Sequence, residues 1–150
     1  MEIFLKITKE KFEEIRKKII EEDNIALENF LKLKKEVFSV NNFLDEDGYP
    51  TSDALSLIET WHHSDPKGLF NFIEKVWHLK YFGWHLVVGG EDEWTKMKIP
   101  ENKIRYYLST AGWSGNEQII HSLESNVEMW DLIWLQSRRG GHYIFELEVD

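Results

Sequence analysis

Residues 104–149 read IRYYLSTAGWSGNEQIIHSLESNVEMWDLIWLQSRRGGHYIFELEV, and this stretch decides the fold class. Residues 104–110 are rich in β-branched and aromatic side chains with a period close to two, which predicts a strand. Residues 116–126 have the spacing of an amphipathic helix, and residues 129–137 and 142–149 predict a hairpin closed by the turn 138–141. Strands joined by hairpins are antiparallel. We therefore expect an α+β domain and no parallel nucleotide-binding fold.

Outward from this stretch, residues 83–88 and 93–99 predict two further strands around a tight turn at 89–92, Gly-Gly-Glu-Asp. The sheet would then have four to five antiparallel strands. One helix would be inserted between the third strand and the final hairpin, and the N-terminal helices would pack on the sheet.

The N-terminal half carries apolar residues at helical spacing, from Phe12 to Phe38. Thr8 is placed to cap the first helix, and Asp23 or Asn24 to end it and cap a second one. This pattern predicts two consecutive helices before residue 40.

Turn and capping residues divide the next segment. Residues 45–50 predict a solvated turn, and Thr51 or Ser52 can cap a short helix that runs to residue 61. Asp65 followed by Pro66 predicts a helix to about residue 78. The chain therefore reads as one α+β domain over 1–150, helical in 1–80 and rich in strands in 81–150.

Composition excludes several classes of protein. The 150 residues hold 18 Lys and Arg against 27 Asp and Glu, a formal charge of -9, and no Cys. The lack of Cys excludes disulfide scaffolds, thiolate zinc sites and cysteine nucleophiles. The acidic balance disfavours general nucleic-acid binding. The N-terminus lacks the apolar core of a secretion signal and no stretch is apolar enough to span a bilayer, so we expect a cytoplasmic protein without membrane contact.

The first candidate site is the glycine-rich loop at 109–117, which precedes a predicted helix. Free N–H groups at a helix start suit phosphate or carboxylate, and Trp113 lies between glycines, where it would be partly exposed. A structural alternative stays open, because Ser114 and Glu117 also form a Ser-x-x-Glu capping box. Glu117 would repel an anion as well.

The second candidate is the hairpin tip, where Arg138 and Arg139 precede Gly140, Gly141 and His142. Two guanidinium groups can hold phosphate or carboxylate bidentately, and the glycines allow a ligand to approach. The alternative is an ordinary turn whose arginines pair with acidic side chains of the protein.

The histidines and tryptophans complete the set of candidates. His62, His63 and Asp65 could offer ligands to a divalent metal, but they lack the i, i+4 spacing of a helical two-His site. We therefore expect no metal and no cofactor. Most of the seven Trp should be core, and the even spacing of Trp130 and Trp134 places both on one face of the predicted strand.

Three segments resemble a group of small uncharacterised proteins from bacterial genomes and their phages. They are DGYPT at 47–51, LSTAGWSGNE at 108–117, and the segment from Trp134 through SRRGGHYIFE at 137–146. No activity is assigned to that group, so the resemblance implies no catalytic residues. It implies a setting in which a small acidic protein binds a host or defence component stoichiometrically.

These observations favour a non-enzymatic binding protein. Its ligand would be a nucleotide-like anion or a host protein. Arg138 and Arg139 would hold negative charge, and Trp113 and Tyr143 would stack on the ligand. Ser114 or Asn116 would donate hydrogen bonds, and the site would extend along the tip to His142.

Two alternatives belong to other classes. One is a small hydrolase or nuclease in which His142 or His121 is the general base and the two arginines stabilise the transition state. The other is an assembly component whose aromatic surface forms an oligomer. The sequence leaves the oligomeric state open.

Overall fold

The computed structural model describes residues 8–92 and 95–149, and it confirms the α+β class. The sheet is antiparallel throughout, with strand order β1-β2-β4-β3. The elements in chain order are α1 (Lys9–Val40), α2 (Ser52–Thr60), α3 (Pro66–Val76), α4 (Lys80–Gly83), β1 (Trp84–Val88), β2 (Lys103–Ser109), α5 (Ser114–Ser125), α6 (Val127–Ile133), β3 (Trp134–Arg138) and β4 (His142–Glu148).

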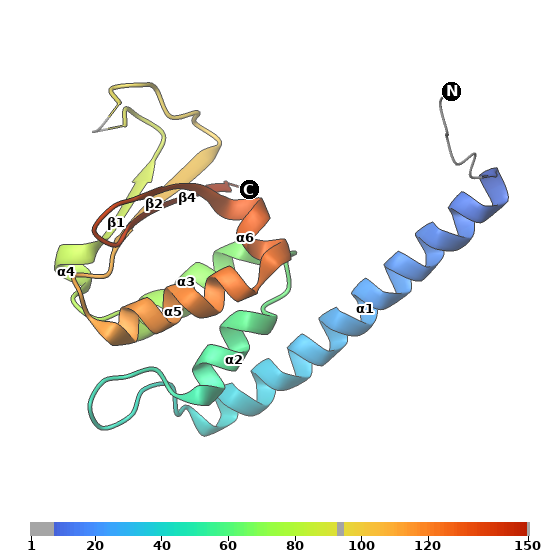
Figure 1. Cartoon of the computed structure of the whole chain (residues 1–150), viewed down its shortest axis with the longest axis horizontal. Coiled ribbons are helices and arrows are strands. Elements are labelled where there is room, and N and C mark those ends of the chain that lie inside the picture. Colours follow the sequence, from blue (N-terminus) through green and yellow to red (C-terminus); the bar gives the residue numbers. More distant parts are fainter. Residues whose placement is uncertain (1–7, 93–94, 150) are drawn as a thin grey trace.

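Helices α3 and α5 lie against one face of the sheet (Figure 1). On β2 the buried residues Ile104, Tyr106 and Leu108 alternate with partly exposed ones and join the core with residues of α3 and α5. Because successive side chains of a strand point to opposite faces, Arg105, Tyr107 and Ser109 lie on the other face. That outer face is where a ligand can reach the sheet.

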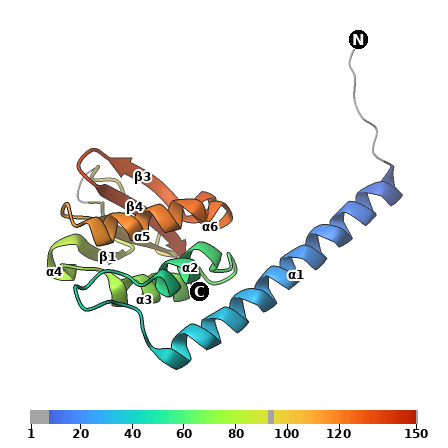
Figure 2. The ribbon, with the colours of Figure 1, turned by 60° about the horizontal axis from the view of Figure 1, so that its bottom comes forward.

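α1 is one continuous helix, so the predicted break at Asp23 or Asn24 is wrong. The carboxylate of Asp23 accepts hydrogen bonds from His62 and His63 and does not cap a second helix. Phe30 and Val37 pack into the core, whereas every residue from 8 to 22 is exposed, including Phe12 at 57%. Figure 2 shows this half of α1 extending away from the rest of the chain.

The predicted starts of α1, α2 and α3 are confirmed. The side chain of Thr8 accepts a hydrogen bond from Lys11 N at the start of α1, and Thr51 accepts one from Ala54 N at the start of α2. Asp65 caps α3, with Pro66 as its first residue. Each of these signals depends only on neighbours within a few residues.

The predicted strand at 93–99 is wrong for the residues that the structure describes. Residues 93 and 94 lie outside the described residues, and 95–99 belong to no named strand. Lys96 N donates to Asp92 O at 2.8 Å, which closes a turn there. The partner of β1 is β2, so the segment 89–102 is a long connection between two neighbouring strands.

The predicted strand at 129–137 is half wrong. Its first part is the helix α6, where Asn126 accepts a hydrogen bond from Met129 N, and only Trp134–Arg138 forms the strand β3. Trp130 and Trp134 therefore do not share a strand, although their rings stack with centroids 6.2 Å apart. None of the helices in 8–92 and 95–149 is long and apolar enough to cross a bilayer.

Candidate functional site

The two glycine-rich segments lie side by side. Thr110 N donates to Gly141 O at 3.0 Å, which joins the loop after β2 to the tip of the β3–β4 hairpin. Gly141 has a φ of +80°, and a Cβ there would come within 2.3 Å of Thr110 Oγ1. Any other residue would be strained at this positive φ and would also displace the Thr110 side chain.

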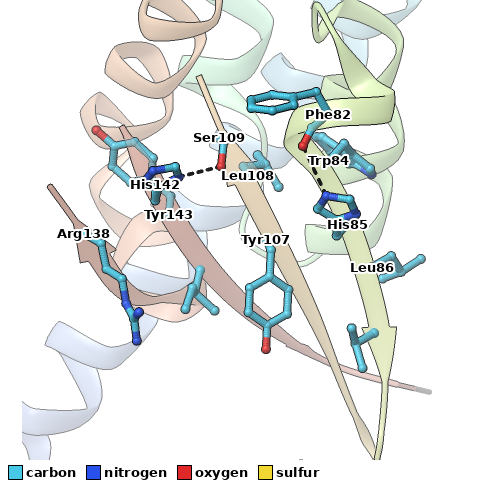
Figure 3. Close-up of a pocket in the computed structure, with 12 residues that line it drawn as sticks. Phe82, Trp84, His85, Leu86, Tyr107, Leu108, Ser109, Arg138, His142 and Tyr143 are labelled. Atoms are coloured by element: carbon cyan, nitrogen blue, oxygen red, sulfur yellow. Dashed lines mark hydrogen bonds between the residues drawn. The ribbon is translucent and has the colours of Figure 1, made fainter. Parts of the chain in front are cut away.

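Beside this junction, the outer face of the sheet forms a groove with a cavity volume of about 540 Å³ (Figure 3). This is within the range of small-molecule sites. The groove is lined by Phe82, Trp84, His85, Leu86, Val87, Tyr107, Leu108, Ser109, Arg138, His142, Tyr143 and Ile144. Arg138, His142 and Tyr143 are the residues of this lining that the sequence indicated.

Two histidines reach the groove from different strands. Ser109 and His142 are paired positions on β2 and β4, and Ser109 Oγ lies 2.6 Å from His142 Nδ1. His85 on β1 lies 3.2 Å from the carbonyl oxygen of Phe82 through Nε2. A carbonyl can only accept, so this nitrogen carries the proton and a neutral His85 offers Nδ1 as an acceptor.

An acidic side chain next to the groove is neutralised by the protein itself. Asp92 is 2% exposed, and its Oδ2 accepts hydrogen bonds from Arg105 Nη1 at 2.8 Å and from the hydroxyl of Tyr107. Arg105 Nε also donates to Glu146 at 2.8 Å. Burial and the hydrogen bond to Asp92 raise the pKa of Tyr107 to about 12. Tyr107 therefore presents a neutral ring to the groove at physiological pH.

A second hollow, of about 390 Å³, lies on the α5 side of the same junction and is lined by Glu117, His121, Glu124 and Tyr143 among others. Burial, then the charges of Glu124 and Glu117, raises the pKa of Tyr143. This hollow is therefore unfavourable for an anion. His121, one of the two predicted general bases, is located here and not in the groove.

Trp113 and Ser114 lie away from the groove. The half-buried Trp113 ring packs between Tyr49 and His78, with both centroid distances 4.7 Å, and Ser114 Oγ lies 3.0 Å from Tyr49 Oη. The predicted capping box is wrong, because α5 begins at Ser114 and the residue at the N-cap is Trp113. The loop is shaped by ring packing instead.

Asn116 has a structural role in place of the predicted contact with a ligand. Its side chain is fully buried, with Nδ2 donating to His78 O at 2.9 Å and Oδ1 accepting from His78 N at 2.9 Å. These bonds attach the start of α5 to the chain after α3 and leave no exposed surface for a ligand. Arg139 is exposed at the hairpin tip, outside the groove lining.

The groove also contains Phe82, His85 and Tyr107, which no sequence pattern indicated as site residues, and Ser109, which lies at the start of the candidate loop 109–117. Tyr107 and Ser109 are two apart on β2, and that spacing already placed them on one face. What was missing was the pairing of β2 with both β1 and β4, which brings His85 and His142 to the same face.

The histidine pair has a different carboxylate partner from the predicted one. Asp65 caps α3, whereas His62 Nε2 and His63 Nε2 each lie 2.9 Å from Asp23 Oδ1 on α1. The pKa of Asp23 is lowered, chiefly by the hydrogen bond from His63 and then by the bond from His62, while desolvation acts in the opposite direction.

Comparisons of the chain with protein-family models, with curated proteins and with solved structures gave no match.

Proposed function

We propose that this protein binds a small anion of the nucleotide class in the outer groove and acts by binding and not by catalysis. The observation that carries the proposal is that Arg138 and His142 line the same groove as the rings of Phe82 and Tyr107. A guanidinium group supplies a bidentate donor for phosphate, and aromatic faces supply stacking surfaces for a base.

The charges near the groove support an anionic ligand. Asp92 is paired with Arg105 and Tyr107, and Glu146 is paired with Arg105, so both acids next to the groove have their charge balanced within the protein. The acidic hollow on the other side of the junction carries Glu117 and Glu124. An anion is therefore expected in the groove, although the whole chain has a charge of -9.

Isothermal titration calorimetry with adenosine 5′-monophosphate tests this proposal, with adenosine and inorganic phosphate as the two partial ligands. We expect Arg138→Gln to weaken binding about 10- to 100-fold, because a hydrogen bond to a charged group contributes about 1.5–3 kcal/mol. Arg139→Gln is the matched control: it removes the same charge one residue away, outside the groove lining, and should leave affinity within about threefold, as expected for an exposed charge. Equal losses in both variants would contradict the placement.

A protein ligand is the other outcome of this test. If the nucleotide does not bind, we propose that the exposed Arg139 tip and the groove bind an acidic protein surface. The resemblance to phage-encoded proteins supports a stoichiometric role of this kind against a host or defence component. The genes next to this one would test that setting.

A hydrolase is a second candidate, and the 2.6 Å contact between Ser109 Oγ and His142 Nδ1 favours it. His142 is within reach to take the hydroxyl proton of Ser109 as a general base, in a groove that also holds Arg138. Turnover of p-nitrophenyl acetate or bis(p-nitrophenyl) phosphate would have to vanish in both Ser109→Ala and His142→Gln. No turnover by the unaltered protein would exclude this candidate.

A further inference from the structure

A second cluster of polar side chains lies where α1 meets the rest of the chain. It combines Asp23 of α1 with His62 and His63, which follow α2. Within residues 8–92 and 95–149, this is the one set of three His, Cys, Asp or Glu residues whose donor atoms all lie within 4.8 Å of one another. It is separate from the groove and plays no part in the proposed function.

The distances are close to those of a bound transition-metal ion. Zn²⁺ holds imidazole nitrogen and carboxylate oxygen at about 2.0–2.2 Å, so two ligand atoms of a tetrahedral site lie roughly 3.4 Å apart. Each histidine Nε2 is 2.9 Å from Asp23 Oδ1, and no pair of the three donor atoms is more than 4.8 Å apart. Small rotations of the side chains would lengthen the two distances from Nε2 to Asp23 Oδ1 and shorten the distance between the two histidine nitrogens.

The ring of His62 is already oriented as a metal ligand would be. His62 is 7% exposed, and its Nδ1 lies 2.7 Å from Ser64 Oγ. A ligating histidine usually holds its second nitrogen in such a hydrogen bond. In the structure Nδ1 accepts from Ser64 N at 3.2 Å, so the proton is on Nε2 and is donated to Asp23 Oδ1. An ion would require the other tautomer: the proton would lie on Nδ1 and be donated to Ser64 Oγ, and the lone pair of Nε2 would be directed to the space shared with Asp23.

A fourth ligand is within reach. Glu128 of α6 places Oε2 3.9 Å from His63 Nε2, and its side chain is 77% exposed and can move. A water molecule is the alternative in that position. The cluster thus joins α1, the segment after α2, and α6, which are far apart in the sequence.

We propose that Asp23, His62 and His63 form a site for a divalent transition-metal ion of the Zn²⁺ type, completed by Glu128 or water. Two imidazoles and one carboxylate suit Zn²⁺, Co²⁺ or Ni²⁺, whereas Mg²⁺ and Ca²⁺ prefer all-oxygen sites. Asp23 is also the first residue of α1 that is partly buried, since the preceding residues of the helix are all exposed. The ion would therefore fix α1 at the point where it leaves the domain.

Calorimetry on the full chain without an affinity tag, dialysed against a chelator, tests this site with ZnCl₂ and with MgCl₂. We expect one Zn²⁺ per chain and no binding of Mg²⁺. His63→Asn and Asp23→Asn should each weaken Zn²⁺ binding by about 100-fold or more, because even a second-shell partner contributes about 10- to 100-fold. His121→Asn is the matched control, an exposed histidine outside the cluster, and should bind Zn²⁺ as the unaltered protein does.

The visible absorption of the Co²⁺-loaded protein gives a second readout that does not depend on affinity alone. A tetrahedral site gives an intense visible band, and His63→Asn should abolish it. Because His63 is only half-buried, its variant should fold even if a change at the buried His62 does not, and circular dichroism checks this. The proposal fails if the unaltered chain does not bind Zn²⁺ at one equivalent, or if His63→Asn and His121→Asn bind it equally well.

Discussion

Replacement of Asp92 by Asn is expected to destabilise the protein by about 3 kcal/mol. Asp92 is almost fully buried and receives hydrogen bonds from Arg105 Nη1, from the hydroxyl of Tyr107 and from Thr95 N at 3.0 Å. An asparagine oxygen can face Arg105 and Tyr107 only if its NH₂ group faces the N–H of Thr95. Two hydrogen bonds then lose their charged acceptor, at about 1 kcal/mol each, and the N–H of the exposed Thr95 loses its partner, at about 0.5–1.5 kcal/mol.

A fully broken buried ion pair lowers the free energy of unfolding by about 3–5 kcal/mol. The loss in Asp92→Asn should not exceed this range, because Arg105 keeps its 2.8 Å bond to Glu146. Urea unfolding measures it as a lower midpoint with an unchanged slope. Glu91→Gln is the control, since it removes the same charge from the exposed neighbouring residue and should change stability by less than about 0.5 kcal/mol. If Asp92→Asn is as mild as this control, the network does not hold the segment 89–102 on the sheet.

Three further outcomes follow from the same structure. Burial and the hydrogen bond to Asp92 raise the pKa of Tyr107 to about 12, so the contribution of Tyr107 to stability is complete below pH ~10 and is lost as the pH rises towards 12. Spectrophotometric titration should show one phenol that ionises at higher pH than the others, and this phenol should be missing in Tyr107→Phe. Asn116→Ala removes two 2.9 Å bonds to the backbone of His78 and should lower the free energy of unfolding by about 2–3 kcal/mol in urea. Phe30→Ala should cost about 3–5 kcal/mol and Phe12→Ala less than about 0.5 kcal/mol, because their exposed fractions are 2% and 57%; similar losses would mean that α1 packs differently.

The sequence predicted the features that depend on near neighbours. The caps Thr8, Thr51 and Asp65 were found because each side chain bonds to an N–H three residues on. The strands β2 and β4 and the turn of the final hairpin were found because turn residues flank these segments. These signals also sufficed for the α+β class.

Features that depend on distant residues were missed or misplaced. The spacing of Trp130 and Trp134 is even, which fits one face of a strand. A separation of four residues also fits one face of a helix, and the structure has the helix α6 at Trp130. Asp23 looked like a helix breaker because the partners that satisfy it, His62 and His63, lie about forty residues away. No local pattern distinguishes these cases.

The candidate site was predicted in part for the same reason. Arg138 and His142 were predicted from the arginines and glycines of the hairpin tip, and both line the groove. Trp113 and Asn116 were chosen from the same loop, but Tyr49 and His78, from other parts of the chain, hold them elsewhere. Membership of the groove is set by which strands pair, and these pairings join residues that are distant in the sequence, such as His85 with Tyr107 and Ser109 with His142.

The most direct test of the groove is to follow the backbone amide resonances of the ¹⁵N-labelled protein during titration with adenosine 5′-monophosphate. We expect saturable shifts at His85, Ser109 and His142, on three strands of the outer face. Shifts confined to the loop around Trp113 or to the hollow around His121, or no shifts at all, would contradict the account.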